Sequence, residues 1–508
     1  MSKVIKLKKG LDIKLNGEAE KVVQPAGKIT SCALKPTDFR AMTPKLAVKV
    51  GDEVKAGDVL FIDKTHPEIK FTTPVSGTIE AINRGERRKL LEVVVKADAE
   101  TRYRDFGKTE VSKLNRDEII DRLLESGVWP LIKQRPYDII ADPMSTPKAV
   151  FVSAFDSAPL APDYDLILNN QSKDLQTGID CLCKLCNKNV NLGLQENTPS
   201  ASVFTKLQHV DINYFAGPHP AGNVGVQIHH LNPINKGEQV WVVNIQDVAI
   251  IGRLFNEGRF DARKIIALAG SEVTKPQYYH SILGASIQDL TAGKLKNAVE
   301  QRIISGNVLT GTRVVPEGHL GYYDNQITVI PEGNNYEFLG WAAPGFNKFS
   351  ASRLFPSFLC PKKHYTLDTN YHGERRAFVV TGQYEKVFPM DIYPVYLLKA
   401  VLAQTGGRHI AGKGDHGHGV HVGSGNAGDQ IGGTRSAGGQ HHAGAARCAG
   451  IAIGRMRSAL LVGGQHMVDA VRILIQLVVQ VQHSTAGVAE DGVHALFAEN
   501  FNKNLRTI

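Results

Sequence analysis

Residues 48 to 60 read Val48-Lys-Val-Gly51-Asp52-Glu-Val54-Lys-Ala-Gly57-Asp58-Val-Leu60. A second half follows at residues 73 to 82, Thr73-Pro74-Val-Ser-Gly77-Thr-Ile79-Glu-Ala-Ile82. Short runs of alternating apolar and polar residues meet at Gly-Asp and Pro-x-x-Gly turns, which is typical of short β-strands. Residues 31 to 99 are therefore predicted to form a compact β-rich unit.

The two halves, in this order, resemble the barrel-sandwich hybrid fold of the lipoyl/biotinyl type. Carriers with that fold expose a lysine at a hairpin tip, where it is covalently modified. The candidate is Lys64, seven residues after Gly57 and ten before Pro74. The midpoint falls instead at Thr65 or His66, so we expect a structural barrel with no covalently bound group.

Residues 100 to 260 alternate between helix and strand patterns. Apolar positions at helical spacing predict an amphipathic helix over Asp117–Glu125. Short strands are predicted over Ala149–Ala154, Tyr164–Leu168 and Gln239–Gln246, and a helix is predicted to begin at Asp247. Such alternation favours an α/β layer.

A glycine-rich stretch, Phe215-Ala-Gly217-Pro218-His219-Pro220-Ala-Gly222-Asn-Val-Gly225, lies within this layer. It lacks the Gly-Lys-Ser/Thr of a phosphate-binding loop and the glycine spacing of the dinucleotide fingerprint. Its prolines also remove N–H groups that would hold a phosphate. A rigid structural loop and a ligand-contacting loop both remain open, and Gly217, His219 and Gly222 are the ligand candidates.

The sequence predicts no metal centre. His229 and His230 have no carboxylate at a ligand-like spacing. Three of the six cysteines form the cluster Cys181-Leu-Cys183-Lys-Leu-Cys186. A closed zinc or iron–sulfur site normally needs four ligands, so these are expected to be ordinary reduced thiols.

Charge and hydropathy limit the classes of partner. The formal net charge of +9 is mild for 508 residues and suits an anionic surface such as the cytoplasmic membrane leaflet. No nucleic-acid-binding signature is present, so no nucleic-acid partner is expected. No apolar run reaches the roughly 18 residues of a membrane span, and the N-terminus lacks the apolar core of a secretory signal. A cytoplasmic chain is therefore expected.

Eight short motifs, in order along residues 4 to 403, resemble the A subunit of the sodium-translocating NADH:quinone reductase. They are Lys8-Lys-Gly-Leu-Asp12, Ala81-Ile-Asn-Arg84-Gly-Glu86-Arg87, Gly217-Pro-His-Pro-Ala-Gly222, Gln246-Asp247, Ala267-Leu-Ala-Gly270, Gly284-Ala-Ser286, Arg302-Ile-Ile-Ser-Gly306 and Asn325-Gln326.

This resemblance implies a function. Complexes of that family oxidise NADH, reduce ubiquinone as substrate and export Na⁺, with FAD, FMN and iron–sulfur centres in partner subunits. The A subunit is peripheral, lies on the cytoplasmic face of the bacterial inner membrane against the membrane-embedded B subunit, which it contacts, and is associated with quinone binding. No residue of this chain is expected to be catalytic.

The resemblance also implies an α/β multidomain fold like that of the NADH-binding flavoprotein subunit of respiratory complex I. The expected parts are an N-terminal segment with a barrel-sandwich hybrid domain (1–99), a Rossmann-like α/β domain (100–260), a ubiquitin-like SLBB domain (261–350) and a C-terminal helical region (351–405).

The flavoprotein relatives carry a glycine-dense loop after the first helix. Here the matching stretch, residues 124 to 137, keeps only Gly127 and carries bulky side chains instead. We therefore expect no FMN, NADH or iron–sulfur cluster in this chain. The same stretch offers apolar walls and a donor for a quinone; the candidates are Trp129, Pro130, Ile132, Arg135 and Tyr137. The alternative is that Trp129 is a core residue and Arg135 forms a salt bridge.

Residues 406 to 508 depart from the rest of the chain in composition. They contain no Pro, Tyr or Trp, but hold 20 of the 49 glycines and 9 of the 18 histidines. The resemblance also ends near Ala403. We interpret this tail as the product of a reading-frame change near Gln404, which would disrupt the C-terminal helical region.

Two further functions stay open. One is an NADH- and FMN-binding flavoprotein subunit like that of complex I. The other is a purely structural subunit whose domains only dock partners.

Overall fold

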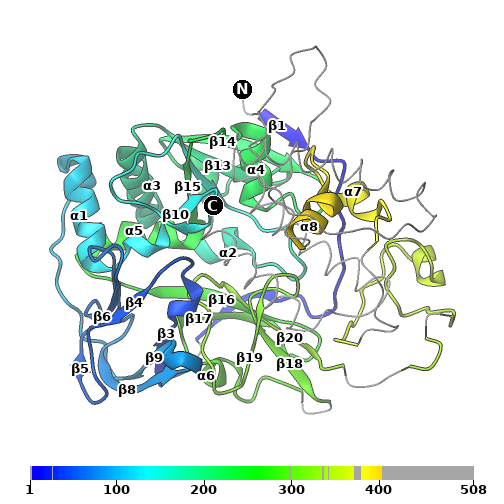
Figure 1. Cartoon of the computed structure of the whole chain (residues 1–508), viewed down its shortest axis with the longest axis horizontal. Coiled ribbons are helices and arrows are strands. Elements are labelled where there is room, and N and C mark those ends of the chain that lie inside the picture. The colour runs from blue at the N-terminus through cyan, green and yellow to red at the C-terminus, as the bar shows by residue number, and fades with distance from the viewer. Residues whose placement is uncertain are drawn as a thin grey trace, which may run out of the picture.

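The computed structural model describes residues 3–25, 27–296, 299–333, 337–340, 342–370 and 379–402. The predicted anomalous tail, 406–508, lies outside the described residues. Figure 1 shows an α/β domain in the upper half, with a blue β-domain and a green β-domain side by side below it. The expected α/β multidomain fold is confirmed.

The first β-domain is the predicted barrel-sandwich hybrid. Its two sheets have strand orders β3-β9-β8-β5 and β4-β6-β7. The strands are β3 (Ser31–Leu34), β4 (Pro44–Leu46), β5 (Glu53–Val54), β6 (Val59–Asp63), β7 (Lys70–Thr72), β8 (Gly77–Arg84) and β9 (Leu90–Ala97). The carboxylates of Asp52 and Asp58 each accept a backbone N–H three residues earlier at 2.7 Å, which fixes the Gly-Asp turns. Lys64 is the first residue of the loop that joins β6 to β7.

The α/β domain contains a seven-stranded sheet of order β1-β14-β13-β12-β15-β10-β11. Its strands are β1 (Lys3–Lys6), β10 (Lys133–Arg135), β11 (Ile139–Ile140), β12 (Val150–Ser153), β13 (Val190–Gln195), β14 (Val210–Ala216) and β15 (Val240–Asn244). The first five strands in the sheet order run parallel, and β10 and β11 complete the edge in antiparallel pairs. From β12 the chain builds the sheet outward through β13 and β14, then returns to place β15 on the other side of β12.

The helices of this domain are α1 (Arg116–Ser126), α2 (Tyr164–Leu168), α3 (Ser172–Cys186), α4 (Val224–Leu231) and α5 (Ile245–Glu257). The helices predicted over Asp117–Glu125 and from Asp247 are present. The strand predicted over Tyr164–Leu168 is wrong, because this stretch is helix α2. Asp163 is its N-cap and accepts the N–H groups of Asp165 and Leu166 at 3.0 and 3.3 Å.

The cysteine cluster lies on α3, with Cys181 and Cys186 buried. Burial raises the pKa of the Cys183 thiol to about 12, which keeps it protonated at neutral pH. Within the described part of the chain, no three His, Cys, Asp or Glu residues are placed together to hold a metal ion.

Helices α3 and α5 pack at a close crossing built on two glycines. A methyl group at Gly252 would overlap the backbone carbonyl of Asp174 on α3. A methyl group at Gly178 would overlap the backbone carbonyl of Val248 on α5. Each helix thus provides a glycine where the other helix's backbone approaches.

We expect Gly252→Ala to lower the free energy of unfolding by about 1–3 kcal/mol, because the helices must separate to admit the methyl group. Urea unfolding followed by circular dichroism measures this. The matched control is Gly85→Ala, where the added methyl would meet only the flexible side chain of Leu91. An equal effect in both variants would contradict the packing argument.

The second β-domain is the SLBB domain, a six-stranded sheet of order β19-β18-β20-β16-β17-β2. Its elements are β2 (Glu20–Gln24), β16 (Arg263–Ala269), β17 (Gln277–Ile282), α6 (Ile287–Thr291), β18 (Gln301–Ser305), β19 (Thr312–Val314) and β20 (Gln326–Pro331). The N-terminal segment thus contributes β1 to the edge of the α/β sheet and β2 to the edge of this sheet.

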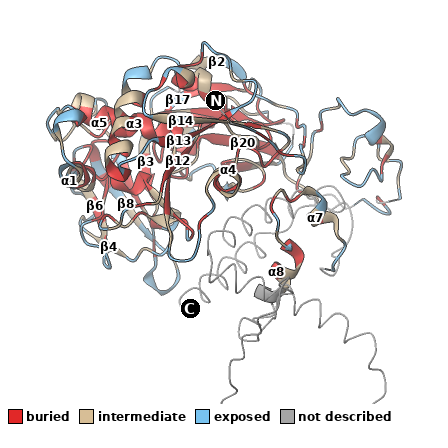
Figure 2. Ribbon diagram, turned by 90° about the horizontal axis from the view of Figure 1, so that it is seen from above, coloured by how far each residue is buried: buried red, intermediate tan, exposed pale blue. Residues whose placement is uncertain are grey.

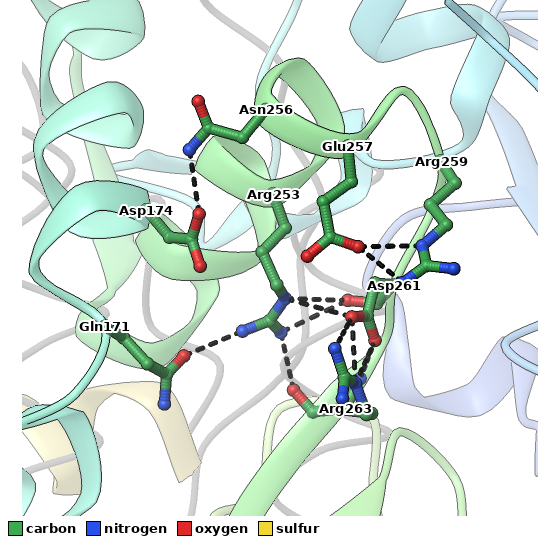
Figure 3. A network of polar contacts seen from close by, with 8 residues as sticks. All are labelled: Gln171, Asp174, Arg253, Asn256, Glu257, Arg259, Asp261 and Arg263. Atoms are coloured by element: carbon green, nitrogen blue, oxygen red, sulfur yellow. Dashed lines mark hydrogen bonds and ion pairs between the residues drawn. The ribbon is translucent and has the colours of Figure 1, made fainter. Parts of the chain in front are cut away.

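A buried charge network fixes α5 to the start of β16 (Figure 3). The Asp261 side chain is fully buried and accepts two hydrogen bonds from Arg263 Nε, at 2.9 and 2.8 Å, and another from the same guanidinium. Arg253 on α5 lies 3.6 Å from the same carboxylate. It also donates to the backbone carbonyl of Arg263 at 2.6 Å and to the Gln171 side chain at 2.7 Å.

The C-terminal region contributes η6 (Pro356–Leu359), α7 (Gln383–Val387) and α8 (Pro394–Leu402). Tyr384, Phe388 and Val395 are buried in a cluster with Ile5 of β1 and Phe215 of β14. Figure 2 shows α7 and α8 beside α4. None of the helices in the described ranges has the length and apolar character needed to cross a bilayer.

Candidate functional site

A cavity of about 230 Å³ opens at the carboxyl ends of β12 and β15. Because β13 and β15 lie on opposite sides of β12, the sheet order reverses between β12 and β15. In open α/β sheets this switch point is where ligands bind, in the crevice beyond the strand ends. Ser153 and Asn244 line the cavity from the two strands, and Asn307 and Thr310 line it from the SLBB domain.

The predicted quinone segment forms one wall of this cavity, through alternate residues. Leu131 ends the short helix η4 (Trp129–Leu131), and β10 follows it. The two-residue period of an extended chain directs Leu131, Lys133 and Arg135 toward the cavity.

The other predicted quinone residues have different surroundings. Trp129 and Ile132 are fully buried in the core. The Trp129 indole N–H donates to the Ala141 carbonyl at 2.7 Å, and its ring packs edge-on against Trp241. Tyr137 is 47% exposed.

Pro130 does not line the cavity, but it holds a residue that does. Its carbonyl accepts the Tyr323 hydroxyl at 2.7 Å, and the Tyr323 ring lines the cavity. The segment therefore lines the cavity through Arg135, which was predicted, and through Leu131 and Lys133, which were not.

The side chains of Arg135 and Lys133 place two positive charges on this wall of the cavity. The Arg135 guanidinium is 3.3 Å from the Asp138 carboxylate, which Arg40 also approaches to 3.6 Å. The ammonium of Lys133 lies 3.4 Å from the centre of the Tyr323 ring, a cation–π contact. Burial raises the pKa of the Tyr323 hydroxyl well above its ordinary value, so it stays a hydrogen-bond donor at neutral pH.

A buried carboxylate, that of Asp247 in the first turn of α5, lines the same cavity. Asp247 is fully buried, and the Lys264 ammonium lies 2.8 Å from its Oδ1. Burial raises the pKa of Asp247, and the positive charge of Lys264 opposes that rise. The two residues come from α5 and β16, so no local sequence pattern could have paired them.

The glycine-rich loop reaches the cavity at Gly222. The N–H of Gly222 donates to the Ser157 hydroxyl at 2.8 Å, and the same hydroxyl lies 3.0 Å from Nδ1 of buried His219. The His219 N–H donates to the Asp12 carboxylate at 2.8 Å. A methyl group at Gly217 would overlap the Leu7 carbonyl. Arg135 and Gly222 therefore both line the cavity, whereas Gly217 and His219 contact the N-terminal segment.

Three parts of the sequence match the domains of one known protein family. Residues 5–98 match the NqrA N-terminal barrel-sandwich hybrid domain, residues 114–260 the NqrA second alpha/beta domain, and residues 265–315 the NQRA C-terminal domain (SLBB). The NqrA protein of the Na(+)-translocating NADH-quinone reductase of Yersinia pestis (strain Angola) is 40% identical over 403 residues, which cover 79% of this chain and 90% of that protein. The chain belongs to the NqrA family.

Other NqrA relatives agree. The NqrA proteins of Saccharophagus degradans and Vibrio vulnificus are each 38% identical, over 78% and 79% of this chain and 89% and 90% of theirs. The resemblance drawn from the short motifs is confirmed. As an NqrA-family chain, the protein is one subunit of an oxidoreductase complex, the Na⁺-translocating NADH-quinone reductase.

Proposed function

We propose that this NqrA-family chain is the peripheral, quinone-binding subunit of its complex. It docks on the membrane-embedded B subunit, on the cytoplasmic face of the bacterial inner membrane, and carries no redox cofactor. Electrons then pass from NADH through FAD, FMN and iron–sulfur centres in partner subunits, and ubiquinone meets this chain as substrate.

The observation that carries the proposal is the wall formed by Leu131, Lys133 and Arg135 in the switch-point cavity. A quinone headgroup is a flat ring with two carbonyl acceptors, so its site needs apolar or aromatic surface and positioned donors. Leu131 and the Tyr323 ring supply surface, and the Arg135 guanidinium supplies N–H donors at the cavity. Among the predicted residues, the quinone contact is thus proposed for Arg135, and Pro130 acts only by holding the Tyr323 hydroxyl. Trp129 and Ile132 lie in the core behind the wall, and Tyr137 is exposed.

Two observations weigh against a flavin or nicotinamide nucleotide in the same cavity. The loop at Gly222 uses its N–H for the Ser157 hydroxyl, so that donor is engaged within the protein. A methyl group at Gly127 would overlap the Thr72 side chain, so this glycine serves packing between α1 and the barrel-sandwich domain. A backbone cradle for phosphate needs glycines that leave their N–H groups open to the ligand.

The test is a titration of the full chain with a short-chain ubiquinone, and separately with NADH, followed by tryptophan fluorescence. We expect saturable binding of quinone and none of NADH. Arg135→Gln should weaken the quinone affinity about tenfold or more, since a charge-assisted hydrogen bond contributes roughly 1.5–3 kcal/mol.

The matched control is Arg84→Gln in the barrel-sandwich domain, which should bind quinone like the parent chain. Thermal unfolding of each variant checks that the fold is kept. Unchanged quinone affinity in Arg135→Gln, both for the chain and for the assembled complex, would contradict the proposal. Yellow flavin in the purified chain, or saturable NADH binding, would favour the flavoprotein function instead.

A further inference from the structure

Residues 337–340 and 342–370, here called the outer lobe, project from the rest of the molecule (Figures 1 and 2). Within the lobe Phe355 and Tyr365 are buried and the Phe349 ring meets Tyr365 edge-on. Phe349 also packs against a buried cluster that contains Ile13 and Leu15 of the N-terminal segment. The lobe is anchored to the N-terminal segment, because the Tyr365 N–H donates to the Lys14 carbonyl at 2.8 Å. The lobe is therefore a folded projection with a defined outer surface.

That outer surface is unusually apolar. Six large apolar side chains of the lobe are 45–92% exposed. They are Phe338, Leu339, Phe346, Leu354, Phe358 and Leu359. Single exposed apolar residues are ordinary, but six of them on one projecting segment indicate an interaction surface.

The charge of the lobe identifies the kind of partner. The lobe holds four Lys or Arg residues, Lys348, Arg353, Lys362 and Lys363, against two acids, Glu337 and Asp368, and Lys348 pairs with Glu337. Its net charge is therefore positive. Arg353 and Lys362 are exposed among the apolar side chains. Protein interfaces are depleted in lysine, whereas apolar side chains interleaved with cations suit the headgroup layer of an anionic bilayer.

We propose that the outer lobe docks on an anionic lipid surface, with Phe338, Phe346 and Leu359 inserted into the headgroup layer and the basic residues held by lipid charges. The inference rests on the proposed peripheral placement of the chain. It names the surface that makes the contact, and it does not involve the quinone cavity.

The test is co-sedimentation of the full chain with phosphatidylcholine vesicles, with and without phosphatidylglycerol. We expect binding to the phosphatidylglycerol vesicles that falls as the ionic strength rises. A triple variant, Phe338→Ser, Phe346→Ser and Leu359→Ser, should lower the partition onto these vesicles about tenfold or more. Met144→Ser is the control, because Met144 is 88% exposed but lies in the α/β domain.

Equal vesicle binding by the parent chain and the triple variant would overturn the proposal, and so would no binding of the parent chain to either vesicle. If the triple variant keeps vesicle binding but no longer copurifies with the other subunits, the lobe is a protein interface and the lipid proposal is wrong. None of these outcomes depends on quinone affinity, so failure here and failure of the proposed quinone function are distinguishable.

Discussion

Replacing Asp261 with asparagine is expected to lower the free energy of unfolding by about 3–5 kcal/mol. The carboxylate is fully buried between the guanidinium groups of Arg253 and Arg263 (Figure 3). An amide of the same shape keeps the volume but removes the negative charge, and the Arg253 guanidinium, whose side chain is only 8% exposed, then loses its counter-ion. Urea unfolding of the full chain measures the loss.

A matched control lies in the same network. Glu257 pairs with Arg259, but both side chains are about one-third exposed, so Glu257→Gln should change stability by about 1 kcal/mol at most. Equal losses in the two variants would show that burial does not govern the energetics of this network.

The Asp261 effect should depend on pH. Burial alone would raise the pKa of this carboxyl, but the Arg263 hydrogen bond and the two guanidinium charges outweigh burial and lower it. Because the folded chain holds this proton less tightly than the unfolded chain, the stabilisation is fully present above the ordinary pKa of about 3.9. It is lost as pH falls through the lowered native pKa.

Replacing Lys264 with methionine is expected to destabilise the chain by about 3–5 kcal/mol at neutral pH, since it leaves the buried Asp247 carboxylate without its ammonium partner. The double variant Asp247→Leu, Lys264→Met should recover most of this loss, because an apolar pair of similar size leaves no buried charge behind. A double variant less stable than Lys264→Met would contradict this account.

The pH dependence of stability expected for Lys264→Met has the opposite sign to that of the Asp261 carboxylate. Burial already raises the Asp247 pKa, and removing Lys264 removes the charge that opposes the rise. The folded variant therefore binds a proton more tightly than the unfolded chain, so its stability falls as pH rises from the ordinary pKa to the raised native pKa. Unfolding of Lys264→Met should show a smaller deficit at about pH 5 than at about pH 8.

The elements that could be predicted from the sequence are those fixed by contacts between residues close together in the chain. Gly-Asp turns are fixed by contacts three residues apart, so the barrel-sandwich strands could be located from the sequence. The stretch Tyr164–Leu168 was misassigned because its five residues are too few to separate helical from strand periodicity, and the Asp163 N-cap was the signal that was overlooked.

The site was only partly predictable. Arg135 was proposed as a donor from composition, and it does line the cavity. Its neighbours Leu131 and Lys133 were not proposed, because the face of β10 that meets the cavity depends on how that strand pairs with β15. The contribution of Asn307 from the SLBB domain depends on domain packing, which no local pattern encodes.

The placement of β1 and β2 has a consequence for synthesis on the ribosome. Asn213, the partner of Lys3, is made 210 residues after it, and Gln277 is made 257 residues after its partner Glu20. At about 5–20 residues per second the second interval lasts roughly 13–50 s. For that time the β2 segment is unpaired and available to chaperones and to neighbouring nascent chains. Segments made early in this stretch of chain are therefore among the last to reach their place.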